Sequence, residues 1–367
     1  MKIIEVTVHG IFGRPGSVTY HFNNDLNILT GRNGSGKTTI IKLAWSIISG
    51  NILLALREIN FKSCVVVTDE YSCTVVRTGP VHCRIELETE EGRQDFEDDN
   101  SDPDEPFMES AEDKAGPILI SKGGSIFFPT FRRIEGGFSM VPNTPTRARP
   151  GQKLGLDLDD SLVSISKTLT NKEHIFVAAI SSQDIVSLLL KRYANFSEEI
   201  NAFQGEVTRS VIEKIRQYEN TQTVKQDADA LLSETRAEIE KIEEFSSKTL
   251  APLTAIRALV EKLFQHSGIS FGKRLSFGDA AAAVNSDALS AGEKQMLSFI
   301  CYNAFYKNSI IFIDEPELSL HVDWQRRLYA ILESQESGNQ FIFATHSPFI
   351  YGKYPEKEVS IGIDKGD

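Results

Sequence analysis

The order of apolar and polar residues predicts that the chain begins with a β-hairpin. Residues 3–8 alternate between the two classes, the pattern breaks across the glycine-containing stretch 10–16, and it resumes across 18–22. Two alternating runs separated by turn residues are typical of paired antiparallel strands. A third apolar stretch, residues 26–29, runs directly into Gly31, so we expect a further strand that ends near this glycine.

Later apolar stretches predict strands of two kinds. Alternation over residues 64–76 and 82–87 is typical of strands that bury one face. Uninterrupted apolar runs at 310–313 and 341–344 are typical of strands buried on both faces of a parallel sheet. A short apolar run at 125–128 predicts one strand within a segment that is otherwise rich in glycine, proline and arginine, which we expect to be loop.

Helical spacing marks two other regions. Residues 38–50 have apolar side chains at helical intervals and end on a glycine, as helices commonly do. Residues 197–250 contain one glycine and no proline, and their apolar positions fall on two helical faces. Their polar middle, residues 220–230, favours a bend. We therefore expect a helical hairpin, and we place a helical insertion at residues 184–270.

Composition narrows the class of protein. The chain has 367 residues, of which 41% are hydrophobic and 25% charged; this is ordinary globular usage and excludes a disordered or collagen-like chain. No apolar run approaches the roughly 18–20 residues that a membrane-spanning helix needs. The four cysteines form no close pair, so the sequence indicates neither a zinc site nor a disulfide framework. We expect a cytoplasmic protein with reduced thiols and no membrane association.

The net charge of −12 is concentrated in one segment. Residues 86–113 contain 14 acidic residues and one basic residue, Arg93, hence a net charge of −13. The remainder of the chain therefore carries a net charge of +1. We interpret this segment as a solvated acidic loop, with docking of a partner or autoinhibition as the alternatives. Because the acidity is local, it does not argue against binding of nucleic acid elsewhere on the chain.

The strongest motif is a phosphate-binding loop. Residues 31–38, GRNGSGKT, follow a predicted strand and open a predicted helix, which is the context that this motif requires. The backbone N–H groups of such a loop and the helix N-terminus bind phosphate oxygens. We expect Lys37 to reach the β- and γ-phosphates of ATP and the Thr38 hydroxyl to bind Mg²⁺. The candidate ATP-binding residues here are Asn33, Gly34, Ser35, Gly36, Lys37, Thr38 and Thr39.

A pair of acidic residues supports this interpretation. Asp314 and Glu315 come directly after the apolar run 310–313, at the carboxyl end of a predicted parallel strand, where such sheets bind ligands. We expect Asp314 to hold Mg²⁺ and Glu315 to polarise the attacking water as a general base. ATP and Mg²⁺ are therefore the expected cofactors.

A basic segment is a further candidate for binding. Residues 129–153 carry five basic residues against one acid, Glu135. The basic residues are Arg132, Arg133, Arg147, Arg149 and Lys153. Two interpretations stay open for the segment, a solvated loop or a surface for an acidic protein or a nucleic acid. One of its first two arginines is also a candidate to face the ATP phosphates.

Residues 289–295, LSAGEKQ, resemble the signature sequence of ABC-type ATPases. Ala291 and Glu293 depart from the commonest form of that sequence. The motif falls where a new helix is expected to begin, so it offers a hydroxyl, backbone N–H groups and a positive dipole end to a phosphate. The resemblance implies that Ser290, Gly292 and Glu293 contact the ATP held by a partner subunit.

Two more residues are assigned through the same resemblance. His346, in the sequence ATHS at 344–347, resembles the switch histidine that senses the γ-phosphate and takes part in catalysis. Gln183, in ISSQD at 180–184, resembles the glutamine that contacts the metal and connects the ATP site to the helical insertion.

Residues 314–321, DEPELSLH, resemble the soluble RecF and OLD group rather than transporter ATPases. The resemblance implies an α/β fold: an ABC-type ATPase head with a mixed or parallel sheet, N-terminal antiparallel strands and a short coiled-coil insertion. The expected domains are residues 1–183 as the N-terminal half of the core, 184–270 as the insertion, and 271–367 as the C-terminal half.

The layout resembles stand-alone ATPases of bacterial antiphage systems, either the AriA-like proteins of PARIS or the Septu-like PtuA proteins. This resemblance implies a sensor and scaffold ATPase that controls a separate nuclease or toxin effector and responds to a phage-encoded trigger protein. It also implies a homodimer formed through shared ATP, or a higher oligomer. Two alternatives stay open: a RecF-like DNA-repair ATPase that binds DNA, and a regulatory subunit in restriction or transposition.

Overall fold

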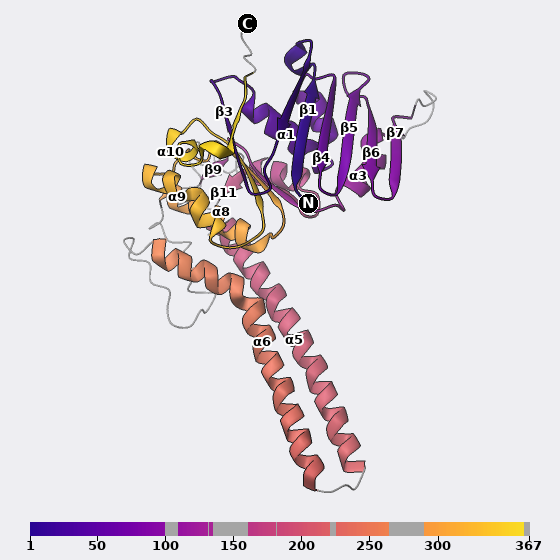
Figure 1. Cartoon of the computed structure of the whole chain (residues 1–367), viewed down its shortest axis with the longest axis vertical. Coiled ribbons are helices and arrows are strands. Elements are labelled where there is room, and N and C mark those ends of the chain that lie inside the picture. The colour runs from indigo at the N-terminus through magenta and orange to yellow at the C-terminus, as the bar shows by residue number, and fades with distance from the viewer. Residues whose placement is uncertain are drawn as a thin grey trace, which may run out of the picture. The chain divides into compact units, whose positions relative to one another are not determined.

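The protein divides into two compact units, residues 1–181 with 290–367, and residues 182–289. We call them the sheet unit and the helical unit. The computed structural model describes residues 1–99, 109–130, 132–134, 161–180, 182–220, 225–263 and 290–362. Figure 1 shows both units along the chain.

The N-terminal part of the sheet unit forms an antiparallel sheet in the order β2-β1-β4-β5-β6-β7 (Figure 1). The predicted hairpin is confirmed, with Val6 of β1 opposite Tyr20 of β2. Alternate positions of β4, β5 and β6 are buried, as the alternating sequence predicts. The strands are β1 (Ile3–His9), β2 (Ser17–His21), β4 (Ser63–Thr68), β5 (Tyr71–Arg77), β6 (Cys83–Thr89) and β7 (Gly92–Glu97).

The prediction of an acidic loop over residues 86–113 is wrong for most of that segment. Its first part lies in β6 and β7, and its last part opens helix α3 (Ala111–Leu119). The acidic residues of the strands lie on the exposed face of the sheet, where Glu86 pairs with Arg93 at 2.6 Å and Asp95 with Arg84 at 3.2 Å. The polar half of an alternating strand therefore has the same local composition as a solvated loop. Residues 100–108 lie outside the described residues.

The second sheet of the sheet unit is parallel, in the order β10-β8-β12-β13-β3-β14. Every position of β3, β8, β12 and β13 is buried, which confirms the predicted two-sided burial. The strands are β3 (Leu26–Thr30), β8 (Ser125–Phe128), β10 (His174–Phe176), β12 (Ile310–Asp314), β13 (Gln340–Ala344) and β14 (Glu358–Ser360). Two short strands, β9 (Arg133–Ile134) and β11 (Ala179–Ile180), pair separately.

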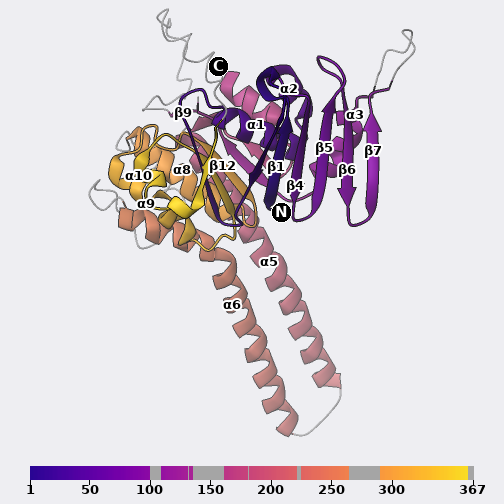
Figure 2. The same ribbon diagram turned by 45° about the horizontal axis from the view of Figure 1, so that its top comes forward.

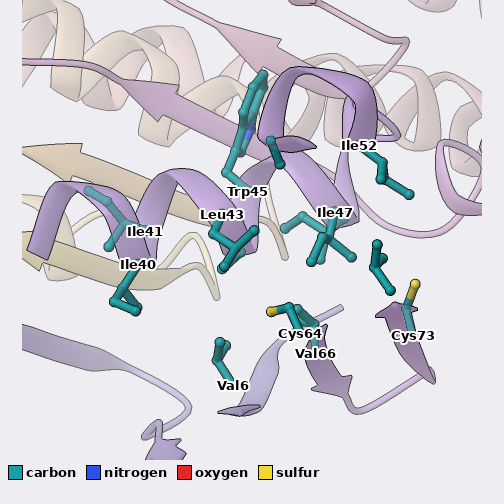
Figure 3. Close-up of a cluster of buried hydrophobic side chains, with 14 of the residues drawn as sticks. Val6, Ile40, Ile41, Leu43, Trp45, Ile47, Ile52, Cys64, Val66 and Cys73 are labelled. Carbon is teal, nitrogen blue, oxygen red and sulfur yellow. The ribbon is translucent and has the colours of Figure 1, made fainter. Parts of the chain in front are cut away.

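Helix α1 (Lys37–Ile48) packs between the two sheets. Its Trp45 contacts Phe127 of the parallel sheet, with ring centroids 5.3 Å apart. Figure 3 shows other α1 side chains, among them Ile47, close to Cys64 and Val66 of the antiparallel sheet. Because sheets cover it on two sides, α1 buries most of its residues, as expected for a helix that is apolar almost all round.

Helices α8 (Ala291–Phe305) and α9 (Val322–Glu333) also pack on the parallel sheet. Phe299 of α8 meets Phe128 of β8 edge to face at 4.9 Å. Neighbouring residues of a strand point to opposite faces, so Phe127 contacts α1 while Phe128 contacts α8. The sheet is thereby covered on both faces, and its carboxyl-terminal edge is the part left for ligands.

The helical unit contains the predicted hairpin. Helix α5 (Ser182–Asn220) ends and α6 (Lys225–Leu263) begins within the polar stretch that favoured a bend. Both views show the two helices side by side (Figures 1 and 2). Phe203 stacks on Phe245 with centroids 4.3 Å apart, and Lys214 pairs with Glu238 at 2.6 Å. No helix among the described residues is long and apolar enough to cross a membrane.

Glu112 makes the stability of the sheet unit depend on pH. Its carboxylate accepts a hydrogen bond of 2.7 Å from the backbone N–H of Leu53, in the first turn of α2 (Ile52–Glu58). Burial raises the Glu112 pKa from 4.5 to about 7. The folded state therefore holds this proton more tightly than the unfolded state, and stability falls as the pH rises from about 4.5 to about 7.

We expect Glu112→Gln to remove this loss, because the amide oxygen still accepts the Leu53 hydrogen bond and carries no charge. The free energy of unfolding at pH 8 should exceed that of the wild type by about 1–3 kcal/mol, with a smaller difference at pH 5. Urea unfolding at both pH values measures this. The exposed Glu91→Gln is the control, and an unaltered pH dependence in Glu112→Gln would contradict the assignment.

Candidate functional site

The phosphate-binding loop joins β3 to α1. Gly31, Gly34 and Gly36 all have positive φ, at 151°, 82° and 93°. A Cβ atom at Gly36 would lie 2.9 Å from the ring of Phe12, and one at Gly31 would lie 2.6 Å from the carbonyl oxygen of Ile361. Glycine is thus required at both positions for conformation and for space.

The other predicted residues of this loop differ in exposure. Asn33 and Gly34 are exposed, and Thr39 in the first turn of α1 is half-buried. Ser35 is 2% exposed, and its hydroxyl has no hydrogen-bond partner among the described residues. A buried hydroxyl without a partner is costly, so Ser35 is suited to a ligand that supplies one.

Lys37 brings the loop and the His346 segment together. Its Nζ donates to the carbonyl oxygens of Gly31 at 3.1 Å and Arg32 at 3.3 Å, and lies 2.7 Å from Nε2 of His346. Burial lowers the pKa of Lys37, and the charges of nearby carboxylates, Glu315 first, oppose this effect. The ammonium group therefore lies among polar groups, and His346 itself is exposed.

Asp314, the last residue of β12, is the buried carboxylate of the site. It is 1% exposed, and burial raises its pKa. The hydroxyl of Thr38 donates to Oδ1 at 3.0 Å, and the hydroxyl of Thr130 donates to Oδ2. A threonine hydroxyl beside a carboxylate is the oxygen donor set that holds Mg²⁺ in phosphate-loop proteins.

Sequence reasoning missed Thr130. This residue follows β8, and β8 pairs with β12. Adjacent parallel strands end at the same sheet edge, so Thr130 and Asp314 meet there. Knowledge that β8 neighbours β12 would have identified Thr130, and the sequence of the segment carries no sign of that pairing.

Glu315 begins a loop that is tied to the His346 segment. Its φ is 48°, an uncommon conformation for a residue other than glycine, and its backbone N–H donates to the carbonyl oxygen of Ala344 at 2.7 Å. The Glu317 carboxylate accepts from the Thr345 hydroxyl and from the His346 N–H, each at 2.7 Å. The loops after β12 and β13 are therefore held together.

Arg132 lies beneath this loop and is 7% exposed. Its guanidinium donates to the carbonyl oxygens of Asp314 at 2.6 Å, Glu315 at 2.9 Å and Pro129 at 2.9 Å. Burial lowers its pKa to about 10, so the group stays charged at neutral pH. Arg132 is one of the two arginines that the sequence offers as candidates to face the ATP phosphates. In the structure its guanidinium instead binds the backbone of Asp314 and Glu315.

The signature sequence opens α8. The Ser290 hydroxyl accepts from the Glu293 N–H at 3.3 Å, and the Glu293 carboxylate accepts from the Ser290 N–H at 2.7 Å, which is a capping box. A Cβ atom at Gly292 would lie 2.3 Å from the carbonyl oxygen of Ser319. In this chain the three residues therefore start a helix that packs closely on the loop after β12; contact with ATP of a partner subunit stays a prediction.

Several predicted residues fall outside what the structure describes. Gln183 lies in the first turn of α5, in the helical unit, and its side chain is outside the described residues. Arg147, Arg149 and Lys153 of the basic segment lie outside them as well. Their predicted roles are untested.

The structural similarity between this chain and solved proteins is low. No curated protein matches the chain. Among solved structures, the Smc head domain of Pyrococcus furiosus bound to the C-terminal domain of ScpA is 13% identical, with 96% of this chain and 91% of that chain covered and a TM-score of 0.38. The Smc head domain of Thermotoga maritima is 15% identical, with 96% and 92% covered and a TM-score of 0.35.

A protein-family model matches more than half of the chain. It is described as "AAA domain, putative AbiEii toxin, Type IV TA system" and aligns with residues 88–351. The aligned range includes Asp314, Glu315 and His346 and begins after the phosphate-binding loop. The protein belongs to this family of phosphate-loop AAA-domain ATPases, whose description links it to type IV toxin–antitoxin systems.

Proposed function

We propose that the protein binds ATP with Mg²⁺ and hydrolyses it at the carboxyl edge of its parallel sheet. The observation that carries this proposal is the convergence of separate segments at that edge. Thr38 lies 3.0 Å from the Asp314 carboxylate, and Lys37 lies 2.7 Å from His346. Lys37 and Thr38 follow β3, Asp314 ends β12 and His346 follows β13, and β3 lies far from the other two strands along the chain.

The charges of the site suit a nucleotide with a divalent cation. Asp314 is almost fully buried, and its carboxylate accepts hydrogen bonds from the hydroxyls of Thr38 and Thr130. The positive charges of Arg132 and Lys37 act on this carboxylate, yet burial still raises its pKa. A cation held by Thr38 and Asp314 would further favour the charged carboxylate. Mg²⁺, when bound, would supply positive charge against the phosphate oxygens. The unpaired Ser35 hydroxyl and the loop amides would face the phosphates.

Each polar residue then has a defined task. Lys37 and the loop N–H groups bind and orient the β- and γ-phosphates. Glu315 accepts a proton from the attacking water. His346 donates toward the γ-phosphate, in a position that the Glu317 carboxylate fixes through the His346 N–H.

We further propose that this ATPase controls a separate toxin or nuclease in a bacterial defence system, as the resemblance to AriA-like and PtuA-like proteins implies. The family description, which names a toxin and a toxin–antitoxin system, supports a partner that carries the effector chemistry. The helical hairpin is the proposed connection between the nucleotide state and that partner.

A challenge assay tests the biological part of the proposal. Cells would express the chain with its neighbouring gene and be infected with phage, with wild type and Glu315→Gln compared in parallel. We expect cells with the wild type to survive infection. We expect cells with Glu315→Gln to differ from them in survival, because the effector is no longer controlled by ATP hydrolysis. Identical outcomes for both, and for cells without the ATPase, would contradict control of an effector. ATP turnover that DNA stimulates and the neighbouring protein does not affect would favour the RecF-like alternative.

The proposed homodimer places ATP between the Lys37 loop of one subunit and Ser290 of the other. Ser290→Arg should stop hydrolysis and preserve ATP binding; Ser290→Ala, which removes the same hydroxyl at a capping cost of about 1 kcal/mol but adds neither bulk nor charge, separates the two effects. Mixing Ser290→Arg with Lys37→Ala regenerates one intact site in each mixed dimer. We expect about a quarter of wild-type turnover from random mixing. Turnover that stays absent after mixing, or that is independent of protein concentration, would contradict the shared site.

A further inference from the structure

Arg132 makes an unusual set of contacts for an arginine beside a nucleotide site. Its two terminal nitrogens donate to the carbonyl oxygens of consecutive residues, Asp314 at 2.6 Å and Glu315 at 2.9 Å. Its guanidinium carbon lies 5.6 Å from the centre of the Phe299 ring on α8. The buried charge is therefore fixed from two sides, by backbone carbonyls and by an aromatic face.

The backbone that Arg132 holds is strained. Glu315 adopts φ 48°, and a residue other than glycine in this region costs on the order of 1–3 kcal/mol unless its surroundings hold it. The N–H of Glu315 is bound to Ala344 and its carbonyl oxygen to Arg132. Both ends of the residue that carries the proposed base are thus anchored, one by β13 and the other by Arg132.

We propose that Arg132 is a positioning residue: it fixes the peptide groups of Asp314 and Glu315, so that the Glu315 carboxylate is held where it takes the proton from water. This inference rests on the proposed ATP hydrolysis. Arg132 acts through the backbone and touches neither ATP nor water in this role. Its loss should therefore lower the turnover number and leave ATP affinity nearly unchanged.

Lysine cannot replace Arg132 in this role. The planar guanidinium reaches two neighbouring carbonyls at once, whereas an ammonium group is a single point on a flexible stem. Arg132→Lys keeps the charge and removes the simultaneous contact. A shift of about 1 Å in a catalytic group is enough to cost about 100-fold in rate, so we expect the turnover number to fall about 10- to 100-fold.

Arg77 provides a matched control within the same unit. Its guanidinium donates to the carbonyl oxygens of Leu56, Ile59 and Phe61 at 2.7 to 2.9 Å and lies 4.9 Å from the centre of the Phe61 ring. The contacts are of the same kind as those of Arg132, and they join α2 to β5 instead of the carboxyl edge of the parallel sheet. Arg77→Lys therefore shows how much turnover depends on an arginine that binds backbone carbonyls away from the site.

The test compares wild type, Arg132→Lys and Arg77→Lys by enzyme assays and by hydrogen exchange. The assays give the turnover number and the ATP dissociation constant. Amide hydrogen exchange is measured without nucleotide, in peptides that cover residues 314–320. We expect Arg132→Lys to lower turnover 10- to 100-fold with ATP affinity within about threefold, and to speed exchange of residues 314–320 about tenfold or more. Arg77→Lys should alter neither.

The outcomes separate this inference from the proposed function. Unchanged turnover in Arg132→Lys, or an equal fall in Arg77→Lys, would overturn the positioning role. If the wild type shows no hydrolysis, the proposed function fails, and exchange alone decides: faster exchange confined to Arg132→Lys supports positioning, and unchanged exchange overturns it. If Arg132→Lys does not fold, Phe299→Leu keeps the arginine and removes its aromatic support. That variant should shift both measurements in the same direction, and no shift would count against the role.

Discussion

Glu315→Gln is expected to stop ATP turnover while ATP stays bound. The amide has nearly the same shape as the carboxylate and cannot accept a proton from the attacking water, so chemistry fails and binding survives. The loss of general-base catalysis should lower the turnover number about 10²- to 10⁴-fold, with ATP affinity equal to or tighter than that of the wild type. Phosphate release and equilibrium binding of labelled ATP measure the two quantities.

Glu336→Gln is a matched control for that variant. Glu336 is an exposed glutamate that also has positive φ, 50°, in the turn between α9 and β13. The same change of charge in the same backbone conformation, remote from the site, should leave turnover within about twofold. Turnover by Glu315→Gln at the wild-type rate would remove Glu315 from the catalytic role.

Lys37→Ala is expected to weaken ATP binding more than any other single change in the site. Its ammonium group lies within hydrogen-bonding distance of both the phosphate loop and His346. Removing a charged hydrogen bond to phosphate costs about 1.5–3 kcal/mol, which corresponds to roughly a 10- to 150-fold rise in the ATP dissociation constant. Isothermal titration with ATP and Mg²⁺ measures this change.

Lys42→Ala controls for loss of a lysine from the same helix. Lys42 is paired with Glu58 of α2 and lies one turn beyond the loop. Its removal should alter ATP affinity by less than about twofold. Equal ATP affinity in Lys37→Ala and the wild type would show that the phosphates bind elsewhere.

The fold follows from the sequence where burial on one or two faces leaves a clear pattern. The runs at 310–313 and 341–344 are typical of strands covered on both sides, and every position of the two strands is buried. The phosphate loop required a strand before it and a helix after it. The prediction of an acidic loop at residues 86–113 was wrong because exposed strand residues and loop residues are equally polar. Alternation of Ile85 and Leu87 with acidic residues was the available signal, and the charge count obscured it.

Site residues that belong to a local sequence motif could be predicted. Residues that strand order brings to the site could not. Lys37 and Asp314 carry their chemistry in their own sequence context. Thr130, Arg132 and Glu317 reach the site because β8 pairs with β12 and β12 with β13. Long-range strand order leaves no trace in spacing or composition. Thr130 and Glu317, and the contacts of the sequence candidate Arg132, could therefore be identified only from the folded chain.

Phosphate release from ATP by the purified protein, with Mg²⁺ and with EDTA, tests the central claim most directly when wild type and Asp314→Asn are compared. The account predicts turnover by the wild type that requires Mg²⁺, and its loss in Asp314→Asn, because the amide weakens the oxygen donor set that Thr38 and Asp314 provide. Turnover that persists in EDTA, or that Asp314→Asn retains in full, would contradict an ATPase site at the carboxyl edge of the parallel sheet.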